Sequence, residues 1–434
     1  MAMSKTSDNQ SFRVVGGRPI GGRLIPSGNK NEALPVVAAA LLAADSVQVE
    51  SMPDILDVRL MVDIAARLGV GVSFDPSGTL NLDATGLSSH EPHPEMSRSI
   101  RGSFLFSAPL LARLGRARLP RPGGDKIGRR RVDTHLLALR ALGAEIVVED
   151  EAYEMRLEGR FRGTDVFLDE ASVMATENAV MAAVCAEGRT RIANAASEPH
   201  VQGLCRALVA MGGRIQGIGT NHLEIEGVDT LHGASHRLGP DHIEIGSFIG
   251  LSAVTGGELI VEGVRADDLR MIGMTFKRLG VHTELQEGSL LVPGGQELAI
   301  QADIHDAIPK VDDAPWPGFP ADLISIAIVV ASQSEGTVLI HEKLFESRLF
   351  FVDKLVSMGA KIVLCDPHRV VVVGPAELHG GEIASPDIRA GMALLIAALC
   401  ATGESTIRNI RQIDRGYERV DERLRELGAD IRRV

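Results

Sequence analysis

The chain has 434 residues, of which 45% are hydrophobic and 24% charged, so it is long enough for two globular domains with sizeable cores. Its net charge of −12 argues against nucleic acid or a membrane surface as a general partner, since both attract an excess of basic residues. The N-terminal twelve residues lack the apolar stretch of a secretion signal, and no apolar run is long enough to span a bilayer. These features favour a soluble, cytoplasmic protein.

A helix that ends in Leu or Met followed by Gly is predicted repeatedly along the chain. The glycines are Gly69, Gly143, Gly212, Gly280, Gly359 and Gly428, separated by 74, 69, 68, 79 and 69 residues. Such regularity indicates six copies of one unit. Solenoid repeats usually have only about 20–45 residues, so we expect two domains of three units each.

Each unit is predicted to contain a buried, Ala-rich helix, then a β-branched strand, then an amphipathic helix. The buried helices include 34–43, 179–186, 247–255 and 392–401, and the strands include 337–340 and 405–407. In the last unit Val420, Leu424 and Leu427 form an apolar helix face, which predicts that Asp421, Glu422 and Arg423 face water. The glycine that follows supplies a left-handed helix end.

The first Gly-rich stretch, 16–31, resembles a phosphate-binding P-loop but does not match it. Five residues separate Gly22 from Gly28, where the motif requires four, and Asn29 precedes Lys30. What remains is a turn that places Lys30 and Asn31 at a helix start. Such a helix end with one lysine suits an anion, although an ordinary solvated turn has the same composition.

A second candidate is the loop 122–135, in which two glycines precede Asp125 and three arginines follow as Arg129, Arg130 and Arg131. It is either a solvated basic loop or a lid that carries an acid and an anion-binding arginine. In the C-terminal half, carboxylates and arginines recur near predicted turns. They are Asp322, Arg348, Asp387, Arg389, Asp414 and Arg415.

These C-terminal residues could be weak surface ion pairs. If the repeats are symmetric, however, the arginines converge, and converging arginines bind carboxylates and phosphates. The cysteines Cys185, Cys205, Cys365 and Cys400 have no metal-binding spacing and are expected to be buried free thiols. The residues alone therefore predict a site for a small anionic molecule between two repeat domains, without a metal.

Several motifs resemble those of the enolpyruvyl transferases, in particular the branch that acts on UDP-N-acetylglucosamine. The matching stretches are 27–35 (SGNKNEALP), 53–58 (PDILDV), 108–115 (APLLARLG), 122–135, 172–178 (SVMATEN), 319–322 (FPAD), 345–348 (FESR), 387–389 (DIR) and 413–419 (IDRGYER). The resemblance extends from Phe12 to Val434. It implies an α/β fold of two domains, each with three βαβαββ units, known as the inverse α/β barrel.

The domains implied are 30–238, with a mobile lid loop at 121–132, and 1–29 together with 239–434. The resemblance also implies a reaction without metal or organic cofactor. The 3-hydroxyl of UDP-N-acetylglucosamine adds to phosphoenolpyruvate, and phosphate then leaves, as the first committed step of peptidoglycan precursor synthesis. Such chemistry needs an acid/base pair and a cluster of cations. The partners expected are these two small molecules, with no nucleic acid and no membrane.

By position in the matching motifs, the resemblance implies a role for each candidate residue. The catalytic residues would be Asp125, Asp322, Lys30 and Arg415, with Asp322 as the base. The phosphoenolpyruvate ligands would be Lys30, Arg101, Arg130, Arg348, Arg389 and Arg415. The acceptor would contact Asn31, Arg130, Arg131, His135, Ser172, Val173, Asp322 and Phe345. Asp387, together with Arg101, would support domain closure.

Four positions depart from the common pattern of the family. Asp125 stands where most members carry a lid cysteine, Arg131 replaces a proline, Met174 replaces a glycine, and Gln412 replaces a histidine. Asp125 can deliver the same proton but offers no thiolate to the epoxide antibiotic fosfomycin, which predicts insensitivity. Arg131 and Met174 leave open a different nucleotide or sugar-nucleotide acceptor in specialised metabolism. A third alternative is a non-catalytic paralogue that only binds ligands.

Overall fold

The computed structural model describes residues 10–125 and 127–434, and the chain divides into two compact units. Unit 1 comprises residues 1–27, 125–129 and 240–434, and unit 2 comprises 28–124 and 130–239. The predicted domain limits assign the whole loop 121–132 to the N-terminal-half domain, whereas residues 125–129 group with unit 1 here. Lys126, inside that loop, lies outside the described residues.

Unit 2 contains three sheets. The first has the order β13-β3-β5-β4, with β13 Ser235–Arg237, β3 Val47–Glu50, β5 Leu80–Asp83 and β4 Gly71–Phe74. The second has the order β11-β12-β10-β9, with β11 Arg214–Gln216, β12 His222–Glu226, β10 Arg189–Ala193 and β9 Asp165–Phe167. The third has only β6 Arg116–Pro120, β8 Ala152–Arg156 and β7 Glu145–Val148.

Unit 1 contains three four-stranded sheets. The orders are β21-β22-β1-β23, β15-β16-β14-β2 and β17-β18-β20-β19. Their strands are β1 Ser11–Val15, β2 Gly22–Leu24, β14 Leu259–Glu262, β15 Glu284–Gln286, β16 Ser289–Val292, β17 Lys310–Asp312, β18 Gly336–His341, β19 Lys361–Asp366, β20 Arg369–Gly374, β21 Glu382–Ala384, β22 Glu404–Arg408 and β23 Asp430–Arg433. β1 pairs with β22 and β23, so the N-terminal strand lies in the same unit as the C-terminus.

The predicted fold of repeated βαβαββ units is confirmed, with one departure among the described residues. The sheet β6-β8-β7 has three strands instead of the four expected. The segment before it makes a single backbone hydrogen bond to this sheet, from the N–H of Arg118 to the carbonyl of His90. Pro92 and Pro94 follow directly, and because proline has no N–H to donate, the segment cannot extend into a ladder.

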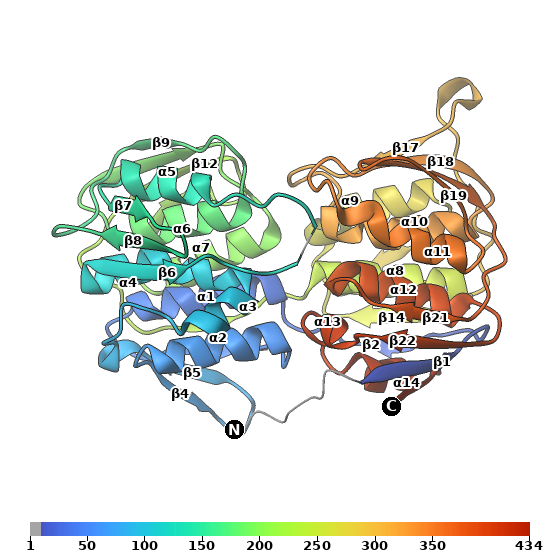
Figure 1. Ribbon diagram of the computed structural model, residues 1–434, viewed down its shortest axis with the longest axis horizontal. Helices are drawn as coiled ribbons and strands as arrows, with labels where there is room; N and C mark the ends of the chain where they lie inside the picture. Colours follow the sequence, from blue (N-terminus) through green and yellow to red (C-terminus); the bar gives the residue numbers. More distant parts are fainter. Residues whose placement is uncertain (1–9, 126) are drawn as a thin grey trace. The chain divides into compact units, whose positions relative to one another are not determined.

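The first helix of each unit is buried, as the small apolar residues predict. These helices are α1 Lys30–Ala39, α4 Ser107–Leu114, α6 Val173–Ala183, α8 His242–Thr255, α10 Ile324–Gln333 and α12 Ile388–Cys400. In Figure 1, α8, α10 and α12 lie between a layer of strands that includes β17 and β18 and another that includes β14 and β22. Unit 1 and unit 2 thus each have their own core, built from the three central helices of three repeats and enclosed by sheets.

The second helix of each unit ends at the repeated glycine. These helices are α2 Leu56–Arg67, α5 Asp133–Ala141, α7 Pro199–Ala210, α9 Ala266–Arg278, α11 Val352–Ser357 and α14 Val420–Glu426. All six glycines have positive φ values, from 88° at Gly280 to 106° at Gly143 and Gly359. The prediction of left-handed helix ends is therefore confirmed, and glycine is the residue that adopts this conformation without a steric cost.

Helix α14 corrects one expectation about solvent exposure. Val420, Leu424 and Leu427 are buried as predicted, but of the three polar residues only Glu422 is exposed. Asp421 is buried and accepts a 2.9 Å bond from Arg433, and Arg423 forms an ion pair with the buried Glu244. Helical periodicity identifies an apolar face, but it does not reveal partners that arrive from another segment.

The cysteines correct a second expectation. All four are free thiols, but only Cys205 is fully buried, and Cys365 is exposed on the edge strand β19. No helix in the described part of the chain is long and apolar enough to cross a membrane. Within residues 10–125 and 127–434, no group of three or more His, Cys, Asp or Glu side chains could hold a metal ion.

Candidate active site

Asp322 lies between two buried arginines of unit 1. It belongs to a short 3-10 turn, Ala321–Leu323, directly before α10. Its Oδ1 accepts a 3.0 Å bond from Nη2 of Arg348, and its Oδ2 accepts a 3.0 Å bond from Nε of Arg389. Both arginines are buried, with relative exposures of 3% and 5%. The structure therefore brings three predicted site residues into direct contact.

Neighbouring groups keep both arginines protonated. Burial is the largest single effect and works to lower the pKa of each guanidinium, but the neighbouring groups together outweigh it, Asp322 first among them, and the pKa of both Arg348 and Arg389 is raised. Nη1 of Arg389 is buried and has no hydrogen-bond partner among the described residues. A permanently charged, unsatisfied donor of this kind is available to a ligand anion.

Aromatic rings and a helix cap orient the same arginines. The guanidinium of Arg348 lies 5.0 Å from the ring centre of Phe345, and that of Arg389 lies 5.5 Å from the ring centre of Tyr417. Asp387 caps α12, since its Oδ1 accepts 2.9 Å bonds from the N–H groups of Arg389 and Ala390. Burial raises the pKa of Asp387, against the effect of these N–H donors. Asp387 thus fixes the start of the helix that carries Arg389.

Arg415 bonds the loop residue Asp125 within unit 1. Its Nη1 donates to Oδ1 of Asp125 and, over 2.8 Å, to Oε1 of Gln412. The loop is also held by a 3.1 Å bond from the N–H of Arg129 to Glu346. Gly128 has a φ of 135°, a conformation that residues with a side chain rarely adopt, and a Cβ there would lie only 3.0 Å from the backbone nitrogen of Glu346. Gln412, one of the four departures from the family pattern, therefore contacts a predicted catalytic arginine directly.

Lys30 and Asp57 form a buried ion pair in unit 2. Lys30 is the first residue of α1, which begins four residues earlier than the predicted helix because the Asn29 side chain caps it. Nζ of Lys30 lies 2.8 Å from Oδ2 of Asp57, and both side chains are 7% exposed. Asp57 belongs to the matching motif 53–58, but no role was predicted for it.

Breaking this pair is expected to destabilise unit 2. Asp57→Ala leaves the buried charge of Lys30 without its partner and should cost about 3–5 kcal/mol. Asp54→Ala removes the exposed partner of Arg59, three residues before Asp57 in the same motif, and should cost only about 0–1 kcal/mol. Protection of the α1 amides against hydrogen exchange measures both changes in opening free energy. Equal losses in the two variants would contradict a special role for the buried pair.

Arg101 and the arginines Arg130 and Arg131 at the end of the lid loop form a second cationic group in unit 2. Nη2 of Arg101 donates a 2.7 Å bond to the carbonyl of Arg131. Burial and, next, the charge of Arg130 lower the pKa of Arg101 to about 10. The cost of holding these cations close together would be relieved by an anion between them, which is the environment predicted for a phosphate.

His135 is buried and neutral. Its Nδ1 accepts a 2.9 Å bond from Nδ2 of Asn178, whose amide also donates to the carbonyl of Phe104 over 3.0 Å. Because Nδ1 accepts, the proton of the neutral imidazole is on Nε2. Burial and then the charge of Arg101 lower the pKa of His135 to about 3. His135 can therefore act as a hydrogen-bond donor through Nε2 at neutral pH, and not as a cation.

Three of the remaining predicted acceptor residues, Arg131, Ser172 and Val173, lie around the start of α6. Arg131 lies 3.5 Å from Asp169 and 3.7 Å from Glu170, which are separated by a single residue from Ser172 and Val173 at the start of α6. Oγ1 of Thr134 donates a 2.7 Å bond to Asp169. Met174 lies in the first turn of α6 and is partly exposed. Asn31 is in the first turn of α1 and donates its N–H to the Asn29 cap.

Sequence analysis missed three residues that hold the predicted ones in place. Asp57 and Asn178 lie inside recognised motifs, so the motif itself was a signal for them. Glu342, fully buried beside Arg348, lies outside every recognised motif and had no such signal. Its position becomes visible only when β18 and the turn after it are in place.

Two α/β units, each carrying buried cations beside a carboxylate, define a protein that handles a small anionic ligand. Comparison with known proteins agrees. Residues 14–424 match the family model of EPSP synthase (3-phosphoshikimate 1-carboxyvinyltransferase). The chain therefore belongs to this family of enolpyruvyl transferases, and the resemblance found in the motifs is confirmed.

Individual relatives are similar over nearly their whole length. A UDP-N-acetylglucosamine 1-carboxyvinyltransferase of Treponema denticola is 53% identical, covering 97% of this chain and 98% of that one. The protein of the same name from Bradyrhizobium diazoefficiens is also 53% identical, covering 98% of each. Among solved structures, the enolpyruvyl transferase NikO of Streptomyces tendae has a TM-score of 0.86 at 24% identity, covering 98% and 99% of the two chains. An EPSP synthase of Acinetobacter baumannii has a TM-score of 0.74 at 18% identity, covering 98% and 100%.

Proposed function

We propose that this chain transfers the enolpyruvyl group of phosphoenolpyruvate to the 3-hydroxyl of UDP-N-acetylglucosamine and releases phosphate, the first committed step of peptidoglycan precursor synthesis. The relatives that are 53% identical over nearly the full chain carry the name of this activity. The proposal places the reaction in the cytoplasm, with two small-molecule substrates and no nucleic acid or membrane partner. The net charge of −12 supports the last point.

The observation that carries the proposal is the carboxylate of Asp322 held by Arg348 and Arg389. Without substrate, Asp322 occupies the donors that the substrate carboxylate would need. When phosphoenolpyruvate binds, its carboxylate takes over these donors, together with the unsatisfied Nη1 of Arg389. Asp322 is then released to accept the proton of the acceptor hydroxyl.

The other residues follow the charge changes of the reaction. The acceptor oxygen bonds to the central carbon of phosphoenolpyruvate while the methylene carbon gains a proton, for which Asp125 is the proposed donor. The resulting methyl group then returns a proton to the carboxylate of Asp125, the C–H electrons restore the double bond, and phosphate leaves with the electrons of its C–O bond. Lys30, Arg101, Arg130 and Arg415 hold the phosphate as its charge increases. Asp387 supports the helix that presents Arg389.

On the acceptor side, the proposed contacts come from one group of residues in unit 2 and from Phe345. They are Asn31, Arg130, Arg131, His135, Ser172 and Val173, with Asp322 at the reacting hydroxyl. His135 offers its Nε2 proton to the acceptor. The ion pairs of Arg131 with Asp169 and Glu170 hold this arginine beside the start of α6.

Phosphate release tests the proposed function directly. We expect purified protein to release phosphate from phosphoenolpyruvate only when UDP-N-acetylglucosamine is present. The product should gain the mass of an enolpyruvyl group. Binding of both substrates without release would instead support a non-catalytic paralogue. Release with another nucleotide sugar, but not with this one, would support the alternative acceptor.

Arg131 and Met174 are the positions where acceptor choice should change. The double variant Arg131→Pro, Met174→Gly restores the residues common in the family, and we expect kcat/KM for UDP-N-acetylglucosamine to stay within about tenfold, the effect of a peripheral contact. Competition between UDP-N-acetylglucosamine and other UDP-sugars measures the preference of each form. If only the double variant uses UDP-N-acetylglucosamine, the natural acceptor is a different one.

A further inference from the structure

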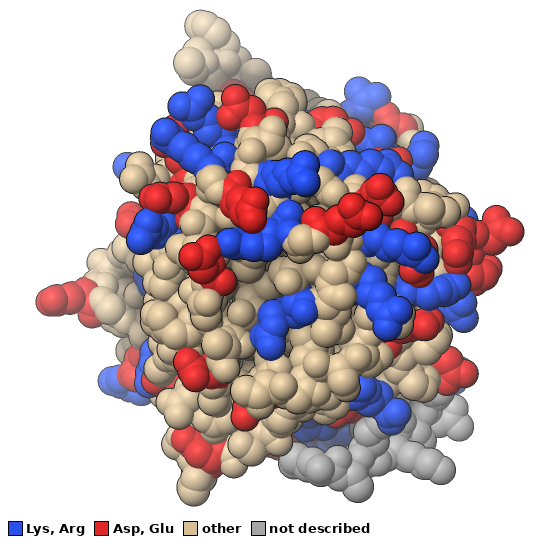
Figure 2. All heavy atoms as spheres, turned by 90° about the vertical axis from the view of Figure 1, so that its left-hand side faces the viewer, with Lys and Arg blue, Asp and Glu red and all other residues tan. Residues whose placement is uncertain are grey.

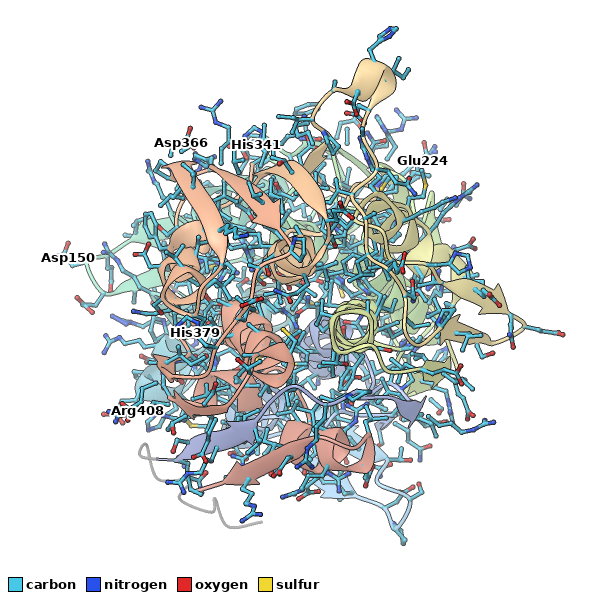
Figure 3. The ribbon with its side chains drawn as sticks, turned by 90° about the vertical axis from the view of Figure 1, so that its right-hand side faces the viewer. Asp150, Glu224, His341, Asp366, His379 and Arg408 are labelled. Carbon is cyan, nitrogen blue, oxygen red and sulfur yellow. The ribbon has the colours of Figure 1, made fainter. Side chains whose placement is uncertain are left out.

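Glu342 is a buried carboxyl group that the proposed reaction does not use. It directly follows His341, the last residue of β18, which is labelled in Figure 3. Its side chain is fully buried. Oε1 accepts bonds from the N–H groups of Leu344 over 3.3 Å and Phe345 over 3.0 Å. Glu342 therefore shapes the turn that leads from β18 to Arg348.

The second oxygen of Glu342 faces Arg348. Oε2 lies 3.5 Å from Nε of Arg348, and neither atom has a hydrogen-bond partner among the described residues. The other end of the same guanidinium donates to Asp322. Arg348 is thus placed between two carboxyl groups, but it makes a good hydrogen bond only to the one that the reaction uses.

Asp313 explains this asymmetry. It is fully buried, and its carboxylate accepts bonds from the N–H groups of Lys343 and Leu344. The N–H of Leu344 is shared between Oδ2 of Asp313 and Oε1 of Glu342, each 3.3 Å away, so the two buried carboxyl groups lie side by side. If both carboxyls were ionised, two like charges would be buried side by side and Oε2 would have no donor. A proton on Glu342 turns this contact into a hydrogen bond.

The surroundings of Glu342 favour that proton. Burial raises the pKa of Glu342 to about 9, and Asp313 contributes to the rise against the opposing effect of Arg348. The other groups around the turn do not offset it. His368 contacts the main-chain carbonyl of Glu342 over 2.7 Å, and the Lys343 side chain forms an ion pair with Asp312.

We propose that Glu342 is a positioning residue for Arg348 that acts in its neutral form, donating a hydrogen bond to Asp313 and leaving the charge of Arg348 to Asp322 and the substrate. The inference rests on the proposed function, because the substrate carboxylate is the second anion that Arg348 would bind. An ionised Glu342 would compete with that carboxylate for the same cation. The turn thus packs against Arg348 without neutralising it.

Kinetics with an isosteric variant test the inference. Glu342→Gln keeps the shape, stays neutral and can donate to Asp313, so we expect KM for phosphoenolpyruvate and kcat within about threefold of wild type. Glu342→Leu removes the hydrogen bonds and should raise KM by about tenfold or more. Above pH about 9 the wild-type KM should rise as Glu342 ionises, whereas that of Glu342→Gln should not. The inference is overturned if Glu342→Gln is as impaired as Glu342→Leu. It is also overturned if the KM of Glu342→Gln rises above pH about 9 as that of the wild type does.

Infrared spectroscopy gives a readout that does not depend on activity. The difference spectrum of wild type minus Glu342→Gln at pH 7 should contain the carbonyl stretch of a protonated carboxylic acid, and this band should disappear above pH about 9. The control is Glu335→Gln, an exposed glutamate just before β18, whose difference spectrum should contain no such band. If the wild type releases no acceptor-dependent phosphate, the proposed function fails. The infrared band alone then shows whether Glu342 is neutral. Absence of the band refutes the inference even in an active enzyme.

Discussion

Replacing Asp322 by Ala should reduce kcat for acceptor-dependent phosphate release by about 10²–10⁴-fold, the usual contribution of a positioned general base. Phosphoenolpyruvate should bind more tightly, because Asp322 no longer competes for Arg348 and Arg389. A fall in kcat together with an equal or lower dissociation constant distinguishes a base from a residue that simply binds substrate. Steady-state turnover and isothermal titration with phosphoenolpyruvate measure the two quantities.

The control for this substitution is Asp366→Asn. Asp366 is also paired with an arginine, Arg369, but the pair is exposed at the end of β19 and labelled in Figure 3. Its loss should change stability by less than about 0.5 kcal/mol and leave turnover unchanged. Thermal unfolding shows whether Asp322→Ala remains folded despite two buried arginines without their carboxylate. A folded Asp322→Ala with at least one tenth of the wild-type turnover would remove Asp322 from the role of base.

Fosfomycin should leave the wild-type protein unmodified and should add one covalent adduct to the Asp125→Cys variant. The nucleophile toward the epoxide is a thiolate, and at this position the wild type offers only a carboxylate paired with Arg415. Three of the four natural cysteines are poor alternatives. Burial raises the pKa of Cys185 to about 11 and that of Cys205 and Cys400 to about 12, so these thiols are not ionised at neutral pH.

Cys365 is the natural cysteine that needs a control, because it is exposed. Both proteins should therefore carry Cys365→Ser, and intact mass spectrometry after incubation with fosfomycin counts the adducts. Peptide mapping should locate the adduct of the variant at position 125. Labelling of Asp125 itself in the wild type would refute the prediction.

Outside these sites, the surface offers little that would distinguish one function from another. Figure 2 shows basic and acidic side chains interleaved over one face. Pairs such as Arg214 with Glu226, 3.0 Å apart, are more than 60% exposed on both sides, and such pairs contribute little to stability. The buried arginines and lysine are therefore the charges whose removal should matter.

Local features were predictable from sequence because they depend on neighbouring residues. The six repeated glycines end six helices in left-handed conformation, since only glycine avoids a steric cost there. The buried helices follow from runs of small apolar residues, although α1 begins at Lys30, four residues before the predicted start, because Asn29 caps it. Family motifs also identified Asp322, Arg348 and Arg389, but only the structure shows that these three side chains contact one another.

Partners that come from distant segments were decided only by the tertiary structure. Helical period predicts that Asp421 and Arg423 face water, yet Asp421 accepts a bond from Arg433 and Arg423 forms an ion pair with Glu244. Asp125 and Arg415 are 290 residues apart in the chain, and nothing in either motif indicates that they form an ion pair. Glu342 gives no signal at all in the sequence.

The physical reason is the difference in range between the two kinds of interaction. Backbone conformation and hydrophobic period act over one or two helical turns, so the sequence by itself determined the six units, their helix ends and the motif residues. The state of a charged group depends on desolvation and on every nearby charge, whichever segment carries it. Only the folded chain therefore decided that Lys30 pairs with Asp57, that His135 is neutral, and that Glu342 lies against Arg348.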